Sequence, residues 1–454
     1  MSYNKKRCFT RVLVIGQRFH RKAGDGITLS NLFSMFDPDC LFSLPLQSGE
    51  SLYDICRNVY EIDPQEVRQY CTLLRVLKRT HKLSFINSEN CLQTHSLSSK
   101  KTNCEQKNTW YKSLKRTVLQ ITGLYHITSK YVISDKLATW LQSINIDVIY
   151  AQFSNLATMR IVIDITQLLN KPLVIHIMDD WISFVVKPSL LSYYLTNKYR
   201  VQFTKILSIS SARIAISESM AIEYKLRYNY NFYWVHNPIE PEQWKLSALA
   251  PSNSTMIIGY FGGVGISNKD SLYDIARAID SINSPLIKLK VFTNDANRLN
   301  KKIFNFICFE LHSAVDFIKY QQEISRCALL ILPFGFSKDS VSFTLLSIPT
   351  KLSEYMVSRI PILVYAPKES ALYKYCFQYS CATLIGNRDV NLIRECILSL
   401  MNNPEPFNKK AEVAYQIAVN TLSKESMQNR LNEIFHIAIQ EGYNNYQTIH
   451  SSLI

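Results

Sequence analysis

The chain has 454 residues, about three times the ~150 that one domain needs, which predicts two or three domains. Hydrophobic residues make up 47% and charged residues 19%, a composition that suits a globular protein and excludes a disordered one. No apolar run approaches the ~18–20 residues of a bilayer span. The start lacks the pattern of a secretory signal, and the 11 cysteines form no CxxC pair or Cys/His cluster. We therefore expect a reduced, cytoplasmic chain with no zinc site.

The net charge of +15 is unevenly distributed. Residues 1–245 hold 31 Lys and Arg against 19 Asp and Glu, whereas residues 246–454 hold 20 against 17. The range 68–136 alone has 13 basic and 3 acidic residues. Such a region attracts anionic partners, namely phospholipid headgroups, lipid-linked phosphates or nucleic acid. A solvated basic surface with no partner is an equal alternative.

Glycine is scarce, yet seven of the 12 glycines lie in two short stretches. Three follow the strand-like run 11–15 and four lie around the end of the run 255–258; they are Gly16, Gly24, Gly26, Gly259, Gly262, Gly263 and Gly265. Each stretch precedes a helix-like pattern of apolar residues, so we predict two strand–glycine loop–helix units. Neither stretch is a G-x-G-x-x-G, so the dinucleotide fingerprint is absent.

Strands and helices alternate between and after these two stretches. Strands are expected at 147–152, 172–178, 213–216, 232–235, 287–293, 328–332 and 361–365. Helices are expected at 155–169, 188–206, 218–228, 351–358 and 389–402, with a polar loop at 87–107 and a final helix over 408–440. This order predicts an α/β chain with two Rossmann-like doubly wound domains, joined by a Pro-containing linker at 237–254. The expected boundaries are 1–240, 241–405 and a helical segment 406–454.

The range 328–361 carries the clearest chemistry. A buried strand ends at Pro333, and a helix is expected to start near Ser347–Thr350 with Ser347 as its N-cap. A helix N-terminus that follows a strand favours a phosphate or diphosphate. Lys351 adds a cation, and Glu354 could accept hydrogen bonds from the two hydroxyls of a ribose. The plain alternative is a capped surface helix.

This segment resembles the glycosyltransferase family 4-like enzymes (glycosyl transferases group 1) of the GT-B fold. Their P-x-K-x-x-E-Y-h-h-x-x-h-P segment, where h is apolar, contributes to a nucleotide-sugar site. The matching residues here are Pro349, Lys351, Glu354, Tyr355, Met356, Val357 and Pro361. By this resemblance Glu354 corresponds to the second glutamate of the family's E-x7-E motif, which holds the donor ribose. The first glutamate is missing, because its position is occupied by Leu346.

Further segments extend the resemblance over most of the chain. The range 258–265 looks like the strand and glycine loop that open the C-terminal domain, although Val264 stands where an arginine is usual. The resemblance implies a donor-binding set of Gly262, Gly263, Lys269, Ser347, Thr350, Lys351 and Glu354. Lys269, backbone N–H groups and Lys351 would then neutralise the diphosphate. A tight turn needed only for packing is the alternative for the glycine loop.

The N-terminal domain supplies the other candidate residues. Gly24, Asp25, Gly26 and Thr28 look like the family's N-terminal glycine loop, which reaches toward acceptor and donor. The strand at 174–178 resembles one in which related enzymes place a histidine facing the cleft. His176 and Asp179 are therefore the candidate catalytic residues, with a satisfied interior histidine as an equal alternative. The only D-x-D triplet, Asp37-Pro38-Asp39, is interpreted as a turn rather than a metal site.

The resemblance implies a glycosyltransferase with two Rossmann-like domains facing across a cleft and a final helix crossing back to the N-terminal domain. It would use a nucleotide-diphosphate sugar of UDP or GDP type, with no cofactor and no metal, and retain the anomeric configuration. The acceptor would be a hydroxyl of a glycan or lipid-linked sugar, in polysaccharide or glycolipid biosynthesis. Basic residues suggest an anionic membrane surface at the cytoplasmic face as a partner; they are Lys100, Lys101, Lys107, Lys112, Lys115 and Arg116.

Two other classes remain open. Because of Leu346 and Val264, the chain could be a GT-B-like protein that binds a sugar or a partner without turnover. The high positive charge could instead indicate a nucleic-acid binder. No helix-turn-helix, zinc-finger or RNP-type signature supports that class, and we expect no nucleic-acid partner.

Overall fold

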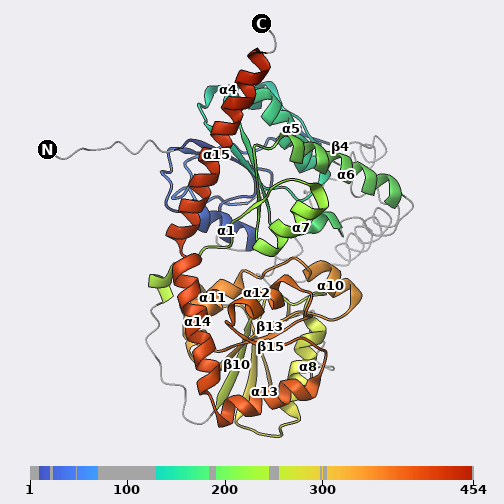
Figure 1. The fold of residues 1–454 in the computed structure, drawn as a ribbon, viewed down its shortest axis with the longest axis vertical. Helices are drawn as coiled ribbons and strands as arrows, with labels where there is room; N and C mark the ends of the chain where they lie inside the picture. The colour runs from blue at the N-terminus through green and yellow to red at the C-terminus, as the bar shows by residue number, and fades with distance from the viewer. Residues whose placement is uncertain are drawn as a thin grey trace, which may run out of the picture. The chain divides into compact units, whose positions relative to one another are not determined.

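The computed structural model describes residues 10–20, 24–47, 49–69, 129–183, 191–244, 255–296, 299 and 304–451. The basic residues between Lys100 and Arg116 lie outside this described part of the chain. The chain divides into two compact units, each built around its own sheet (Figure 1). Unit 1 comprises Met1–Ala215, Tyr224–Tyr233 and Leu431–Ile454, and unit 2 comprises Ile216–Glu223 and Trp234–Arg430.

Unit 1 contains a seven-stranded sheet of order β3-β2-β1-β6-β7-β8-β9. Strand β1 pairs in parallel with β2 and β6, and β7 pairs in parallel with β6 and β8. Every residue of β1 is buried, as expected for a parallel strand covered on both faces. The strands are β1 Val12–Gly16, β2 Leu41–Pro45, β3 Asn58–Val59, β6 Val148–Ala151, β7 Leu173–Ile177, β8 Ala212–Ala215 and β9 Tyr233–Trp234. A separate antiparallel pair joins β4 Val67–Gln69 to β5 Ser129–Tyr131.

Helices flank this sheet in the order expected for a doubly wound fold. They are α1 Gly24–Phe33, α4 Asp135–Ser143, α5 Leu156–Leu169, α6 Ser192–Ile209 and α7 Glu218–Tyr228. Asn155 begins α5 as a capping box: its side chain accepts the Thr158 N–H, and the Thr158 hydroxyl oxygen accepts the Asn155 N–H. The predicted helices at 155–169 and 218–228 are confirmed. Short 3₁₀ turns occur at Pro64–Glu66, Trp181–Ser183 and Pro241–Trp244.

Unit 2 contains a six-stranded sheet of order β12-β11-β10-β13-β14-β15, in which all neighbouring strands pair in parallel. The strands are β10 Met256–Phe261, β11 Ile287–Phe292, β12 Phe309–His312, β13 Leu329–Pro333, β14 Ile362–Tyr365 and β15 Thr383–Ile385. The helices are α8 Lys269–Asp280, α9 Phe317–Ser325, α10 Lys338–Thr344, α11 Lys351–Val357, α12 Ala371–Tyr379, α13 Val390–Asn402 and α14 Glu405–Thr421.

Alternation along the strands of unit 2 divides its core into two layers. In β13, Leu329 and Ile331 belong to one buried cluster, and Leu330 and Leu332 belong to the other. Successive side chains of a strand point to opposite faces of the sheet, so each face carries its own apolar layer. Helices α8 and α13 contact one another over the first layer, and α11 and α14 over the second. This is the doubly wound arrangement that the sequence predicts.

The final helix is not continuous, contrary to the prediction of one helix over 408–440. Helix α14 ends at Thr421 and α15 spans Lys424–Ser451. The Ser423 hydroxyl accepts the Ser426 N–H and so caps the new helix, while Ile239 pairs with the break through the Leu422 carbonyl and the Lys424 N–H. The two helices therefore start and stop at a point fixed by another segment of unit 2.

The last part of α15 returns to unit 1. Phe435 is fully buried there, with ring centroids 6.3 Å from Phe33, 6.2 Å from Phe36 and 6.2 Å from Tyr150. Phe33 in turn lies 5.1 Å from Tyr150, so one aromatic cluster joins α1, β6 and α15. The C-terminal helix thus completes the core of the N-terminal unit.

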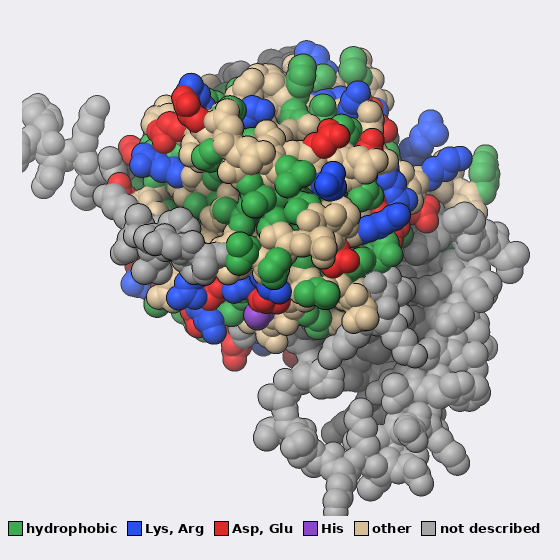
Figure 2. Space-filling view, turned by 90° about the horizontal axis from the view of Figure 1, so that it is seen from below, with side chains coloured by type: hydrophobic (Ala, Val, Ile, Leu, Met, Phe, Trp, Pro, Cys, Tyr) green, Lys and Arg blue, Asp and Glu red, His purple; other side chains and the backbone are tan. Residues whose placement is uncertain are grey.

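The charges on the face of unit 2 drawn in Figure 2 are mixed. Lysine and arginine side chains alternate with aspartate and glutamate around a group of apolar side chains. This agrees with the nearly balanced counts of residues 246–454, 20 basic against 17 acidic. Within the described residues no helix is both long enough and apolar enough to cross a bilayer.

Candidate functional site

In each sheet the first three strands in the sequence extend to one side of the first strand, and the later strands extend to its other side. The strand order therefore reverses next to the first strand. The sheet of unit 1 runs outward in both directions from β1 and β6, and that of unit 2 from β10 and β13. In doubly wound sheets ligands bind at the carboxyl ends of the strands at this reversal. The candidate residues following β10 and β13 in unit 2 lie at that edge, as do those following β1 and β7 in unit 1.

The glycine loop after β10 is braced by side chains of unit 2. The Val264 N–H donates to Asp295 Oδ2 at 3.0 Å, and the Gly265 N–H donates to Asn268 Oδ1 at 3.0 Å. Asn268 Nδ2 donates to the Gly263 carbonyl at 2.9 Å and to the Tyr260 hydroxyl at 2.7 Å. The loop is therefore held in one shape, and these two N–H groups are already bonded within the protein.

Two glycines of this loop lie close to polar groups. A Cβ at Gly263 would lie 3.3 Å from Asp295 Oδ2, and one at Gly262 would lie 3.1 Å from the Tyr260 hydroxyl and 3.9 Å from Lys351 Cε. The loop thus passes directly beside the Lys351 side chain. The structure brings these parts of the predicted donor set together.

Helix α11 is fixed to the end of β10 by Tyr355. The buried Tyr355 hydroxyl accepts the N–H of Phe261, the last residue of β10, at 3.0 Å. This contact holds the first turn of α11, with Lys351 and Glu354, beside the glycine loop. The Tyr of the P-x-K-x-x-E-Y segment therefore has a structural role that its sequence position alone did not indicate.

Glu354 forms a polar cluster with Lys351 and Tyr320. Its Oε2 accepts hydrogen bonds from the Tyr320 hydroxyl and from Lys351 Nζ, the latter at 3.2 Å. Lys351 Nζ also lies 4.7 Å from the centre of the Tyr320 ring, a cation–π contact. The carboxylate side chain is 14% exposed and that of Lys351 is 31% exposed, so solvent or a ligand can reach both.

Tyr320 keeps its proton in this cluster. Burial raises the pKa of its hydroxyl well above the ordinary value, and the nearby Glu354 carboxylate raises it further. The phenol is therefore a hydrogen-bond donor that orients one oxygen of Glu354. Among the described residues no hydrogen bond ends on the other oxygen, Oε1, which is left to accept a ligand hydroxyl.

Helix α11 starts at the predicted residue, but the predicted N-cap, Ser347, is wrong. The helix begins at Lys351 with Thr350 at the N-cap, and Thr350 makes no side-chain cap bond. The Ser347 hydroxyl instead donates to the Phe343 carbonyl at 3.3 Å, back toward α10. Ser347 fails as a cap because a turn closed by the Leu352 N–H and the Pro349 carbonyl lies between it and the helix.

The other predicted cation of the donor set, Lys269, begins helix α8. Its N–H bonds to the Gly265 carbonyl at 3.0 Å, so its backbone is tied to the glycine loop. Within the described residues no contact joins its ammonium group to Lys351 or Glu354.

The two departures from the family pattern are buried apolar positions. Leu346 is 7% exposed and Val264 is 1% exposed, and Val264 belongs to the apolar layer under α8. Neither position could hold a charged side chain without a change in packing. At both positions where the resemblance leads us to expect a charged side chain, the chain has a buried apolar residue.

Around His176 the corresponding edge of unit 1 is buried. His176 in β7 is 1% exposed, and its Nδ1 lies 2.6 Å from the Tyr150 hydroxyl of β6. Gln152 Nε2 donates to the same hydroxyl at 2.9 Å, while Gln152 Oε1 is buried without a partner among the described residues. Burial raises the pKa of Tyr150, so the phenol stays protonated. This geometry matches the alternative interpretation of His176 as an interior residue.

Asp180 rather than Asp179 organises the loop after β7. Its carboxylate accepts bonds from the Tyr224 hydroxyl at 2.7 Å and from Arg227 Nη1 and the Ser183 hydroxyl at 2.8 Å each. Asp179 is half-buried beside it at the carboxyl end of β7. The buried Asp180 is thus paired with the Arg227 guanidinium.

The predicted N-terminal glycine loop is not a loop. Gly24, Asp25, Gly26 and Thr28 all lie in helix α1, and Thr28 is fully buried. A Cβ at Gly26 would lie 2.3 Å from His20 Cε1, so a larger residue there would displace the His20 ring. Gly26 therefore lets a side chain approach a helix, which a sequence pattern does not distinguish from a ligand-binding loop.

The D-x-D triplet forms the predicted turn. Asp37 Oδ1 accepts the Asp39 N–H at 3.0 Å, and the Asp37 carbonyl accepts the Cys40 N–H. Among the described residues no group of three or more His, Cys, Asp or Glu side chains could hold a metal ion.

Three residues of the unit 2 site were not identified from the sequence: Tyr320, Asp295 and Asn268. Tyr320 is 34 residues from Glu354 and reaches it from α9, and Asp295 is 31 residues from Val264. No local spacing links such pairs. Asn268 could have been suspected from the sequence, because an Asn directly before a helix is a common N-cap.

The two doubly wound units, with a final helix that returns to unit 1, define the GT-B fold. Among solved structures, Anabaena HepE in complex with UDP-glucose is 11% identical, with a TM-score of 0.58 over 93% of this chain and 98% of that one. Sucrose-phosphate synthase from Thermosynechococcus elongatus is 11% identical, with a TM-score of 0.57 over 94% and 98%. The α,α-trehalose 6-phosphate synthase from Burkholderia multivorans is 10% identical, with a TM-score of 0.57 over 96% and 98%.

No protein-family model and no curated protein sequence matches the chain. The likeness to solved structures is thus one of fold, at identities that carry no residue roles. It covers nearly the whole of each compared chain, so both units belong to the shared architecture.

Proposed function

We propose that the chain is a glycosyltransferase that moves a sugar from a nucleotide-diphosphate sugar to an acceptor hydroxyl. The observation that carries the proposal is the Glu354–Lys351–Tyr320 cluster beside the glycine loop, at the edge where strand order reverses in unit 2. The fold it shares with UDP-glucose-bound HepE supports a nucleotide sugar as the ligand of this edge.

Each group of the cluster has a task in this proposal. Glu354 Oε1 accepts a ribose hydroxyl, while Tyr320 fixes the other oxygen. Lys351, and Lys269 at the start of α8, compensate the charge that develops on the leaving diphosphate. The bond between the anomeric carbon and the diphosphate oxygen breaks, and the bond to the acceptor oxygen forms. The products are the glycosylated acceptor, the nucleoside diphosphate and one proton.

The finer parts of the proposal come from the family resemblance. They are retention of the anomeric configuration, transfer without a metal, and a glycan or lipid-linked acceptor at the cytoplasmic face of a membrane. Domain closure would exclude water, so that the acceptor rather than solvent is glycosylated. The experiments below test the donor site first because every finer part depends on it.

A thermal-shift panel tests the donor site. The ligands are UDP, GDP, ADP, CMP and their common sugar conjugates, added to wild type, Glu354→Ala and Glu395→Ala. Glu395 is the matched control, an exposed glutamate of α13 in the same unit. Ligand at ~100 times its Kd stabilises the fold by ~2.7 kcal/mol, a shift that is easily measured.

We expect one diphosphate nucleotide to raise the Tm of wild type and of Glu395→Ala. Glu354→Ala should weaken its binding by about 10- to 100-fold, since a hydrogen bond to a charged group contributes ~1.5–3 kcal/mol. Equal responses of both variants, or no response to any nucleotide, would remove the donor site from the proposal. The Tm without ligand reports any loss of folding in Glu354→Ala.

A second candidate function is binding of a nucleotide sugar without turnover. The buried Leu346 and Val264 favour it, because the charges that the family uses near the donor are absent at both positions. Release of nucleoside diphosphate from the sugar conjugate that binds separates the two functions. Binding without release over a range of sugar acceptors would favour the non-catalytic one.

A further inference from the structure

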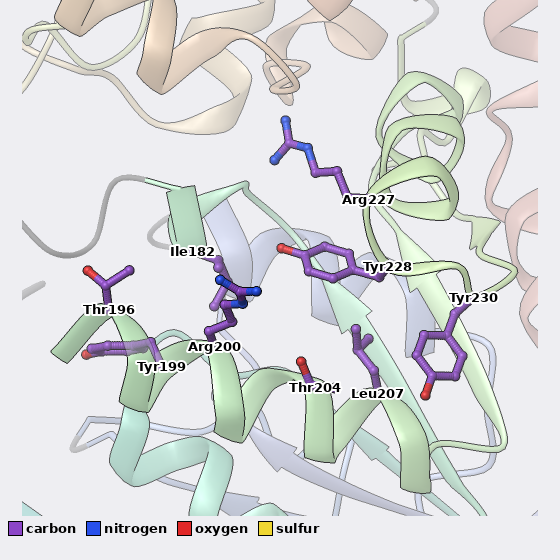
Figure 3. A pocket seen from close by; sticks show the side chains of 9 residues that line it. All are labelled: Ile182, Thr196, Tyr199, Arg200, Thr204, Leu207, Arg227, Tyr228 and Tyr230. Atoms are coloured by element: carbon purple, nitrogen blue, oxygen red, sulfur yellow. The ribbon is translucent and has the colours of Figure 1, made fainter. Parts of the chain in front are cut away.

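Unit 1 contains a pocket that the proposed donor site does not use. It has a volume of about 400 Å³ and lies between helices α6 and α7 (Figure 3). This volume falls within the ~300–1,000 Å³ of small-molecule sites. Its lining is polar and aromatic, and consists of Ile182, Thr196, Tyr199, Arg200, Thr204, Leu207, Arg227, Tyr228 and Tyr230.

Two guanidinium groups reach this pocket from different helices. Arg227 comes from α7 and is held in place by Asp180 at 2.8 Å and by the Ser183 hydroxyl at 3.0 Å. Arg200 comes from α6 and is exposed; among the described residues no carboxylate forms a salt bridge with it. One arginine is therefore pre-positioned, and the other carries a positive charge that no described acidic side chain offsets by a direct contact.

Tyr228 stands between the two arginines. Figure 3 shows its hydroxyl pointing across the pocket toward the Arg200 side. Edge contacts with Phe203 at 5.0 Å and Tyr224 at 5.2 Å fix its ring. Burial and the nearby Asp180 carboxylate raise the pKa of Tyr228 despite the opposing effect of the two arginines, so its hydroxyl stays protonated.

The remaining lining suits a ring with hydroxyl groups. Tyr230 is fixed by the Arg213 guanidinium, whose central carbon lies 4.3 Å from the centre of its ring, and Tyr228 and Tyr230 are both half-buried, so a ligand can contact them. Held aromatic rings provide flat apolar surfaces at low entropic cost, and the Thr196 and Thr204 hydroxyls add donors and acceptors. Guanidinium groups match the oxygens of a phosphate, which they bind in bidentate geometry.

We propose that this pocket binds a sugar phosphate, with the phosphate held by Arg200 and Arg227 and the sugar ring against Tyr228 and Tyr230. The binding itself is independent of the donor site. The assignment of this ligand as the acceptor of the transfer rests on the proposed function, and names the acceptor class as a phosphorylated sugar.

Calorimetric titration of the full chain tests the pocket. The probes are glucose 6-phosphate, glucuronate and glucose, which share a sugar ring and differ in the charged group. The variants are Arg200→Gln, Arg200→Lys and Lys205→Gln. Lys205 is the matched control, because it is an exposed cation on the same helix that does not line the pocket.

We expect wild type and Lys205→Gln to bind glucose 6-phosphate and to bind glucose at least tenfold more weakly. Arg200→Gln should bind glucose 6-phosphate at least tenfold more weakly than wild type, and Arg200→Lys should lie between the two. Arg200 is exposed, so these variants should keep the Tm of the unliganded protein. Glu354→Ala should bind glucose 6-phosphate as wild type does, which separates this pocket from the donor site.

Three results would overturn the proposal. They are no binding of glucose 6-phosphate to wild type, an equal loss in Lys205→Gln, and tighter binding of glucuronate than of glucose 6-phosphate. The second would indicate attraction by general positive charge, and the third a carboxylate ligand. A failure of nucleotide binding in the donor panel would leave the pocket in place and remove only its assignment to an acceptor.

Discussion

Around His176, at the carboxyl edge of the unit 1 sheet, the polar groups are buried and bond to one another, whereas around Glu354, at the same edge of unit 2, they form a charged cluster that solvent can reach. His176 is 1% exposed and lies against the neutral Tyr150. Lys351 is 31% exposed and pairs with Glu354. The two sheets share a topology, so the topology alone does not decide which edge carries ionic chemistry. The difference supports the proposed placement of the donor site in unit 2.

The largest loss of stability is expected from a substitution of Gly16, at the closely packed carboxyl end of β1 in unit 1. This glycine has φ +118°, and a Cβ there would lie 1.9 Å from the Gln152 carbonyl oxygen. Gly16→Ala should lower the free energy of unfolding by about 4 kcal/mol, because backbone strain adds to a clash that no rotamer relieves. Urea unfolding followed by circular dichroism measures this loss.

Gly49→Ala is the matched control for Gly16. Gly49 has φ +154°, but its Cβ would meet only Arg18 Cδ at 3.6 Å, an ordinary contact. The strain alone should cost about 1–2 kcal/mol. Equal losses in the two variants would mean that the two strand ends of unit 1 are not as closely packed as described.

A smaller loss is expected from Tyr150→Phe, which tests whether the unit 1 edge is structural. The change leaves His176 Nδ1 and Gln152 Nε2 without the shared hydroxyl and should cost about 2 kcal/mol in stability. Nucleotide affinity should stay within twofold of wild type. A loss of nucleotide release of 100-fold or more with an unchanged Tm would instead give His176 a catalytic role.

The smallest effect is a change in nucleotide affinity, which is expected from Asp295→Asn beside the glycine loop of unit 2. Asparagine keeps an acceptor for the Val264 N–H but removes a negative charge beside the glycine loop. Binding of the diphosphate nucleotide should tighten by about three- to tenfold, or ~1 kcal/mol. Asp280→Asn, at the exposed far end of α8, should leave the affinity unchanged. Weaker binding in Asp295→Asn would show that the loop needs the carboxylate to keep its shape.

Much of the fold could be predicted from the sequence because buried parallel strands and amphipathic helices leave a strong local pattern. The helix Glu218–Tyr228 has the predicted bounds, and β6 lies within the predicted range 147–152. The break at Ser423 was missed because neither proline nor glycine marks it, and its cause is a bond to the distant Ile239.

The candidate site likewise contains residues that could be predicted from the sequence and residues that could not. Lys351 and Glu354 could be identified because they lie three residues apart on one helix, and the structure shows that they pair. Tyr320 could not be identified from the sequence, because only the fold brings it to Glu354, which lies 34 residues away. The stretch Gly24–Thr28 is predicted to be a loop but lies in helix α1, where the missing side chain of Gly26 leaves room for the His20 ring. Local patterns therefore identify residues on one element, and miss partners that only folding brings together.

The position of Phe435 has a consequence for how the chain is made. The aromatic cluster of Phe33, Phe36 and Tyr150 is covered by a residue from the last helix, which leaves the ribosome after all of unit 2. At the ~5–20 residues per second of synthesis, roughly 285 residues separate Tyr150 from Phe435, so this surface stays uncovered for on the order of 15–60 s. Unit 2 can complete its sheet in that interval, and unit 1, although first in sequence, finishes last.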